Sequence, residues 1–197
     1  MKKDSTKAIS AAIAILNNGG VIAHATDTCY GFACDVFSEQ GLGRLYKIKK
    51  MPNSKPVSIL VSDLKMAKKY GIFNKRAEKL AKKYWPGALT IVVKRKKSLP
   101  RFLNPKLKTV GIRLPAHALS RKLARLLGRP ITTTSANISG KPAPYSVVVI
   151  RRQLSSQKFK PDFIIDSGGL PKKLPSTIVE ITGNKIKILR VGATTLD

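Results

Sequence analysis

Acidic, sulfur-containing, aromatic and histidine side chains are scarce in this sequence. Its 197 residues include 10 Asp and Glu against 38 Lys and Arg, with 2 Cys, 2 His and an aromatic share of 6%. No apolar run reaches the roughly 18 residues of a membrane span, and no export cleavage pattern follows the apolar N-terminal stretch. We therefore expect a soluble, cytoplasmic protein without membrane contact. The few, scattered aromatics disfavour a base-stacking platform for single-stranded nucleic acid.

The scarcity of cysteine and histidine limits the chemistry that the chain can carry. The two cysteines, Cys29 and Cys34, lie five residues apart, and the two histidines are His24 and His117. A zinc site is one alternative, but the spacing matches no common ligand pattern, so small buried thiols are the better interpretation. A GxxxxGK[ST] loop, a GxGxxG turn and a Ser-His-Asp set are missing, so any ATP site lies outside the common nucleotide folds. We expect no disulfide and no structural metal held by protein side chains.

Positive charge is what the sequence has in excess. The formal net charge is +28, and lysines and arginines recur in clusters along the whole chain. A field of this size attracts polyanions, so RNA or nucleotides are natural partners, with binding that weakens as salt rises. A proteome that uses lysine freely would produce much of this charge without any role in nucleic-acid binding, and that alternative stays open.

Hydrophobic periodicity predicts an alternation of helices and strands. Ile9, Ile13 and Leu16 recur at helical spacing before Gly19. Further helices are predicted from Ser38, over 63–70, over 74–84 and over 116–127, and strands over 21–25, 56–62, 88–93, 109–115, 130–135, 163–166, 176–182 and 185–190. The last two strands would form a hairpin at Gly183-Asn184. This order predicts a single α/β domain over residues 1–197, with a twisted mixed β-sheet flanked by helices.

Hydroxyl and amide side chains gather directly after apolar strands. They occur in three segments, 26–28, 132–140 and 175–177. If the strand ends face one way, these segments converge on one crevice. Neutral donors and acceptors there would suit phosphate oxygens, a ribose or a small zwitterion. Ordinary turn chemistry explains any one of the segments taken alone.

Four cationic residues are candidates for binding an anion in that crevice. Arg113 lies inside the apolar strand VGIRLP, and burying its charge is costly unless an anion meets it. Lys49 and Lys55 flank the helix break KKMPNSKP, and Arg190 ends the last strand. A carboxylate or a phosphate is the simplest partner for Arg113, whereas solvated surface charge is the alternative for the lysines.

Six segments in a fixed order resemble the YrdC-like domain of threonylcarbamoyl-AMP synthases. They are GGVIAHATDTCYGFACD, LYKIKKMPNSKPVSILVSD, YWPGALTIVV, TVGIRLPAH, PITTTSANISGKPAP and STIVEI followed by ILRVG. The resemblance covers about residues 8–193 and is specific, because six ordered motifs match by chance far less often than one. It implies the short, single-domain form of the family, in which a concave basic cavity on a twisted α/β sheet holds the substrates.

The resemblance also implies an activity and a set of site residues. The activity is that of a nucleotidyltransferase that makes L-threonylcarbamoyladenylate and pyrophosphate from L-threonine, bicarbonate and ATP, with Mg²⁺ accompanying ATP. Its product would serve N6-threonylcarbamoyladenosine modification at position 37 of tRNAs that read codons starting with A, through a threonylcarbamoyl transferase complex. By position, the expected L-threonine-binding residues are Thr28, Leu60, Arg113, Thr133 and Ser176, and the expected ATP-binding residues are Lys49, Met51, Lys55, Thr109, Ser135, Asn137, Ala143 and Arg190. Among these, Lys49, Lys55 and Arg113 would act as electrostatic stabilisers.

Two positions depart from the family pattern. Met51 stands where the family commonly has an arginine, and Ala143 stands where its loop often has a serine. The nearby Lys50 is a candidate to replace the missing arginine. An ATP-binding paralogue with another small substrate is therefore one alternative function. A non-catalytic module that binds tRNA or double-stranded RNA through shape and phosphate contacts is another.

Overall fold

Helices and strands alternate along the chain in the computed structural model, which describes residues 3–183 and 185–196. The helices are α1 (Lys3–Asn17), α2 (Glu39–Lys49), α3 (Leu64–Tyr70), α4 (Lys75–Tyr84), α5 (Ala118–Leu127) and α6 (Val147–Leu154). The strands are β1 (Ile22–Ala25), β2 (Tyr30–Ala33), β3 (Ser58–Leu60), β4 (Gly71–Ile72), β5 (Leu89–Arg95), β6 (Thr109–Arg113), β7 (Ile131–Ser135), β8 (Phe163–Ile164), β9 (Thr177–Glu180) and β10 (Lys187–Arg190). Within the described ranges, no helix is both long and apolar enough to cross a bilayer.

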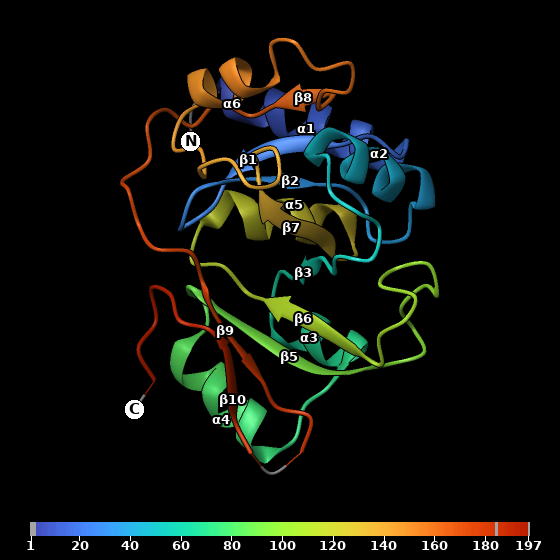
Figure 1. Cartoon of the computed structure of the whole chain (residues 1–197), viewed down its shortest axis with the longest axis vertical. Helices are drawn as coiled ribbons and strands as arrows, with labels where there is room; N and C mark the ends of the chain where they lie inside the picture. Colours follow the sequence, from blue (N-terminus) through green and yellow to red (C-terminus); the bar gives the residue numbers. More distant parts are fainter. Residues whose placement is uncertain (1–2, 184, 197) are drawn as a thin grey trace.

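The strands form a mixed sheet in the order β10-β9-β5-β6-β3-β7-β2-β1-β8, with β4 beside β5 (Figure 1). β3 runs parallel to β6, and β5 runs parallel to β9. β7 lies between β2 and β3 and is antiparallel to both. These pairings confirm the predicted α/β class, a mixed sheet flanked by helices.

Local chemistry explains where most helices begin and end. Ser38, Asp63 and Asn74 cap α2, α3 and α4, because each side-chain oxygen accepts a hydrogen bond from the backbone N–H three residues ahead. Gly128 ends α5 in the left-handed conformation, with φ of 73°, which glycine adopts without steric cost. The helices predicted at these positions are confirmed.

Three elements differ from the sequence predictions. Strand β2, which pairs antiparallel with β1 across the turn formed by residues 26–29, was not predicted. Helix α6 and the short strand β4 were not predicted either. β9 and β10 pair antiparallel as expected, but the Gly183-Asn184 turn proposed between them includes Asn184, which lies outside the described residues.

Helices pack on both faces of the sheet. α1 and α5 lie together on one face, where Leu16, Leu123 and Ile131 share a buried cluster. α2 and α6 cover the opposite face near β1 and β2, and they contribute Leu45 and Ile150 to the larger core. α3 and α4 join the same core beside β5 and β6, in the lower half of Figure 1.

Beyond α5, one face of the sheet is left without a helix. Ile59, Ile91 and Ile112, on β3, β5 and β6, are completely buried in the core that contains α3 and α4. Successive side chains of a strand point to opposite faces. Ser58 and Thr90 therefore point the other way, into an open cavity. This uncovered face, rather than a row of strand ends, forms the floor of the crevice expected from the sequence.

His24 is a fully buried histidine between β1 and α5. Its Nδ1 lies 3.0 Å from the carbonyl oxygen of Ala25 and 3.3 Å from Ser120 Oγ, while its Nε2 has no hydrogen-bond partner among the described residues. Burial, aided by the nearby His117 and Arg113, lowers the pKa of His24 to about 4. The folded protein therefore keeps this imidazole neutral at pH values where an unfolded chain protonates it.

The neutral state of His24 predicts that the protein becomes less stable as the pH is lowered. Between the unfolded pKa of 6.5 and the folded pKa of about 4, the unfolded chain binds more protons, so acid favours unfolding. Lowering the pH from 7 to 5 should remove about 2 kcal/mol of unfolding free energy through this residue. Urea unfolding at both pH values measures it. The variant His24→Gln should lose correspondingly less, and equal losses in the two proteins would contradict the prediction.

Candidate functional site

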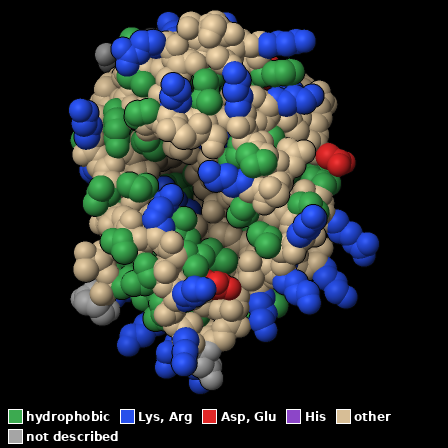
Figure 2. All heavy atoms as spheres, in the orientation of Figure 1, with side chains coloured by type: hydrophobic (Ala, Val, Ile, Leu, Met, Phe, Trp, Pro, Cys, Tyr) green, Lys and Arg blue, Asp and Glu red, His purple; other side chains and the backbone are tan. Residues whose placement is uncertain are grey.

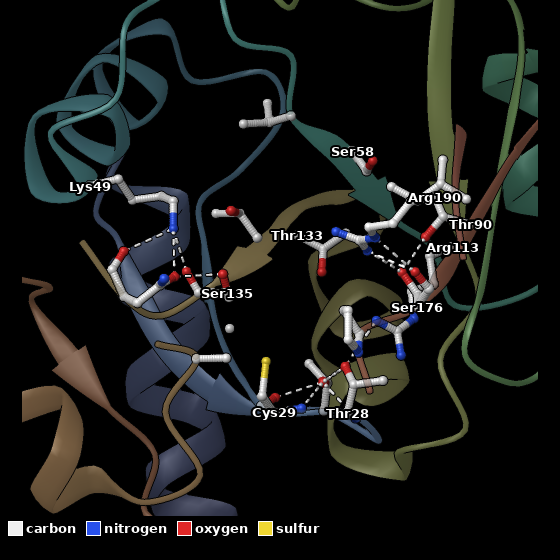
Figure 3. A pocket seen from close by; sticks show the side chains of 18 of the residues that line it. Thr28, Cys29, Lys49, Ser58, Thr90, Arg113, Thr133, Ser135, Ser176 and Arg190 are labelled. Atoms are coloured by element: carbon white, nitrogen blue, oxygen red, sulfur yellow. Dashed lines mark hydrogen bonds between the residues drawn. The ribbon is translucent and has the colours of Figure 1, made fainter. Parts of the chain in front are cut away.

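A cavity of about 450 Å³ opens on the uncovered face of the sheet (Figures 2 and 3). Its size lies within the range of small-molecule sites. Its walls come from segments far apart in the sequence: the turn after β1, the end of α2, the start of β9 and the strands β3, β5, β6, β7 and β10. Lys and Arg side chains surround the central hollow of this face, where Asp and Glu are sparse (Figure 2).

Arg113 lies at the end of β6 and is held from three directions. Its Nη2 lies 2.8 Å from Asp27 Oδ1, its Nη1 donates to Thr28 Oγ1 at 3.2 Å, and its Nε donates to the carbonyl oxygen of Gly87 at 3.3 Å. The Arg113 and Asp27 side chains are only 7% and 12% exposed. The anion that the sequence required beside a buried Arg113 is therefore a carboxylate of the chain itself.

The turn between β1 and β2 is built to present Thr28 to Arg113. Thr26 Oγ1 accepts hydrogen bonds from the backbone N–H groups of Thr28 and Cys29, at 3.2 and 3.3 Å, and donates to the carbonyl oxygen of Cys29 at 2.7 Å. This local network fixes the tight turn, as is typical of threonine side chains in loops. Thr28 consequently lies on the cavity wall, next to the guanidinium of Arg113.

A second guanidinium lies on the same wall (Figure 3). Arg190 donates through Nε and Nη2 to the carbonyl oxygen of Ser176, at 3.0 and 2.8 Å. Ser176 Oγ in turn lies 3.0 Å from Thr90 Oγ1. Burial, and next the positive charge of Arg113, lowers the pKa of Arg190. Two like charges held this close create a strong local preference for an anionic ligand.

Lys49 forms the opposite wall, at the end of α2 (Figure 3). Its ammonium donates to the backbone oxygens of Ser135 and Asn137 and to Asn137 Oδ1. Asn137 Oδ1 also accepts from Ser135 Oγ, and its amide nitrogen donates to the carbonyl oxygen of Lys141. Burial, and then the charge of Lys55, lowers the pKa of Lys49 to about 8. Because an ammonium has three donors, Lys49 here uses all of them to shape the loop after β7.

The cavity brings together most of the site residues expected from the sequence. Those that line it are Thr28, Lys49, Met51, Lys55, Arg113, Thr133, Ser135, Asn137, Ala143, Ser176 and Arg190. Their binding roles stay predictions. Lys50, the candidate to replace an arginine at position 51, is exposed, adopts the left-handed conformation that ends α2, and does not line the cavity.

Two expected site residues lie away from the cavity. Leu60 is completely buried, in the cluster formed with α1 and α5, because α5 covers this end of β3. Thr109 begins β6, four residues before Arg113, and pairs with Lys94. At about 3.3 Å per residue, it lies roughly 13 Å from the end of the strand that carries the site. Neither side chain is on the cavity wall.

Sequence reasoning also missed several residues of the cavity wall. Ser58 and Thr90 lie inside strands otherwise rich in apolar residues. The alternation of hydroxyl and apolar side chains within these strands was the available indication. Tyr145 and Lys173 lie in segments without regular secondary structure, and no sequence pattern marks them.

The cysteines and histidines do not form a metal site. Cys29 lines the cavity, whereas Cys34 is buried, with its Sγ 3.5 Å from Thr132 Oγ1. Burial raises the pKa of both thiols, that of Cys34 to about 12, so both are protonated near neutral pH. In residues 3–183 and 185–196, no three His, Cys, Asp or Glu side chains come together in a way that could hold a metal ion.

The fold and the cavity define an α/β protein whose site, rich in hydroxyl groups and cations, suits a small anionic ligand. The model of the Sua5/YciO/YrdC family, described as telomere recombination, matches residues 14–192. The chain belongs to this family, as the six ordered motifs indicated.

Relatives of known name or structure cover nearly all of the chain. A Methanocaldococcus jannaschii protein named putative threonylcarbamoyl-AMP synthase is 37% identical over 89% of this chain and 81% of its own length. A structure of Pyrococcus abyssi Sua5 complexed with L-threonine matches with a TM-score of 0.87 and 33% identity, over 93% of this chain and 54% of Sua5. Escherichia coli YciO matches with a TM-score of 0.85 and 29% identity, over 96% and 91%. This chain thus spans about half of the P. abyssi protein but most of the other two.

The ion pair between Arg113 and Asp27 predicts a large effect of removing its acid. Asp27→Ala leaves a nearly buried guanidinium without its counter-ion, which should lower the free energy of unfolding by about 3 kcal/mol. Urea denaturation measures the change.

The exposed ion pair of Lys68 and Glu78 provides the control. Because water screens that pair, Glu78→Ala should leave the unfolding free energy nearly unchanged. An Asp27 variant as stable as the Glu78 variant would show that the Arg113 contact contributes little to the fold.

Proposed function

We propose that this protein synthesises L-threonylcarbamoyladenylate and pyrophosphate from L-threonine, bicarbonate and ATP. The observation that carries the proposal is the pair of facing walls in one cavity: Arg113 with Thr28 and Ser176 on one side, and Lys49 with its ordered loop on the other. Relatives named threonylcarbamoyl-AMP synthase, with 31% to 37% identity over most of the chain, support it.

The Arg113 wall fits a small amino acid. A guanidinium binds a carboxylate in a planar, bidentate fashion, and the hydroxyls of Thr28, Thr133 and Ser176 can accept from an ammonium or donate to a carboxylate. Because Asp27 already occupies one edge of Arg113, the amino acid would use the donors that face the cavity. The P. abyssi Sua5 structure complexed with L-threonine supports threonine as the amino acid.

The opposite wall and the cavity mouth suit ATP. Lys55 supplies positive charge, and Ser135 and Asn137 supply polar atoms beside Lys49. Arg190 adds a further cation from the wall of Arg113. Magnesium would arrive bound to the nucleotide as part of the substrate, since no Asp or Glu is among the described residues of the cavity wall. The ion would supply further charge neutralisation at the phosphates.

The chemistry needs positioning and electrostatics more than acid-base groups. The threonine nitrogen attacks the carbon of bicarbonate, water leaves, and a carbamate forms. A carbamate oxygen then attacks the α-phosphorus of ATP, and the bond to the β-phosphate oxygen breaks to release pyrophosphate. Fixed cations that face the developing negative charge stabilise that transition state without rearranging, and holding the reactants together removes the entropic cost of their encounter. The adenylate would then pass to a transferase that acts on tRNA.

Release of pyrophosphate tests the function directly. Purified protein with ATP, Mg²⁺ and bicarbonate should release pyrophosphate when L-threonine is added, and much less with L-serine, which lacks the methyl group. Release without dependence on threonine would indicate another small substrate. If neither ATP nor threonine raises the melting temperature while tRNA binds in a salt-dependent manner, the +28 charge would serve an RNA-binding module instead.

Arg113→Lys should remove most of the activity. Lysine keeps the charge but cannot form the two parallel hydrogen bonds of a guanidinium. Losing a charged hydrogen bond should reduce kcat/KM for threonine by about 10- to 100-fold. Steady-state kinetics measures this, with urea denaturation to establish that the variant folds. An unchanged affinity for threonine would remove Arg113 from the proposed carboxylate site.

A further inference from the structure

The five cations of the cavity wall differ in how far their charges are already engaged. Arg113 is paired with Asp27, Arg190 donates to Ser176, and Lys49 donates to three oxygens. Lys55 and Lys173 also line the cavity, but the ammonium group of neither has a hydrogen bond or an ion pair within residues 3–183 and 185–196. These two lysines can bind an incoming anion without first giving up a protein partner.

Lys173 belongs to the connection between β8 and β9, residues 165–176, which runs from one half of the molecule to the other (Figure 1, orange to red). Most of this connection is exposed. Tyr145 attaches it to the cavity wall: its carbonyl oxygen accepts from the backbone N–H of Leu170, and its hydroxyl donates to the carbonyl oxygen of Lys173, both at 2.8 Å. The backbone of Lys173 is thus fixed at the cavity edge, while its ammonium group has no partner in the part of the chain that the structure describes.

The excess of positive charge on the cavity wall favours a polyanion as ligand. Of the five wall cations, Asp27 neutralises one, which leaves four, and the described wall residues include no Asp or Glu. A single carboxylate or bicarbonate would compensate only one of these charges. A chain of phosphates, with several negative oxygens, matches the distribution better because it can reach cations on more than one wall.

We infer that Lys173 binds the phosphate chain of ATP and the departing pyrophosphate, and that Tyr145 is the residue that positions it. The inference rests on the proposed function for the identity of the nucleotide. It gives the cavity a cation from the β8–β9 connection, a charge that the apolar Met51, which also lines the cavity, does not supply.

Nucleotide titrations of the full chain test the inference without requiring turnover. Isothermal titration calorimetry with ATP, ADP, AMP and pyrophosphate, in the absence of threonine, separates phosphate contacts from contacts to the nucleoside. Lys173→Ala should weaken ATP and pyrophosphate about tenfold and AMP by less than twofold. Lys173→Arg, which keeps the charge, should bind ATP nearly as the wild type does.

Lys172→Ala is the matched control. It removes the same charge from the neighbouring position, which is exposed and does not line the cavity, so its ATP affinity should equal that of the wild type. Equal losses in the two variants would overturn the inference, because they would reflect only the overall charge. An unchanged ATP affinity in Lys173→Ala would overturn it as well.

Tyr145→Phe tests the positioning role. It removes one hydroxyl and keeps the ring, so it should reduce the ratio of ATP to AMP affinity two- to fivefold with the melting temperature unchanged. A stability loss with an unchanged ratio would assign Tyr145 a purely structural role.

Failure of the proposed function would look different. In that case the wild type would bind pyrophosphate but show no threonine-dependent turnover, and Lys173→Ala would still bind pyrophosphate about tenfold more weakly. A wild type that binds neither ATP nor pyrophosphate would overturn the inference about Lys173 itself.

Discussion

The buried ion pair between Arg113 and Asp27 is the constraint on which the site depends. It joins the end of β6, in one half of the sheet, to the turn between β1 and β2 in the other half. A guanidinium that is 7% exposed cannot be left unpaired, so the turn must close over it. That closure also puts Thr28 on Arg113 and fixes one wall of the cavity. The remaining wall residues are arranged around this joint.

Lys49 performs the corresponding task on the other side of the cavity. Its buried ammonium replaces water with three oxygen acceptors, from the last residue of β7 and from the loop after it, and these contacts hold the loop in place as a surface for a ligand. Both walls thus use a buried cation to organise polar backbone. The ammonium groups of Lys55 and Lys173 have no partner among the described residues, so these lysines can bind a ligand without breaking an existing contact. A site built in this way is largely formed before its ligand arrives, which reduces the entropy lost on binding.

Features set by local chemistry could be predicted from the sequence, whereas features set by packing between distant segments could not. Capping side chains and periodic apolar residues located the helices other than α6, and ordered motifs located most of the cavity wall. Leu60 is buried because the distant helix α5 packs over it, which no local pattern predicts. Asp27 reaches Arg113 because it lies in the turn of the β1–β2 hairpin. Both strands of that hairpin are buried throughout, so they show no alternation of polar and apolar residues that would reveal it. Likewise, nothing local distinguishes Lys173, on the wall, from the solvated Lys50.

The order of the strands determines when the cavity becomes complete during synthesis of the chain. β7 is inserted between β2 and β3, and β9 and β10 are added beside β5 after every other strand has been made. Ser176 and Arg190, which complete the wall around Arg113, belong to this final addition. Until the ribosome has translated β10, one side of the cavity is therefore missing. Before that point the growing polypeptide cannot bind its ligand in a complete site and use that binding energy to guide folding.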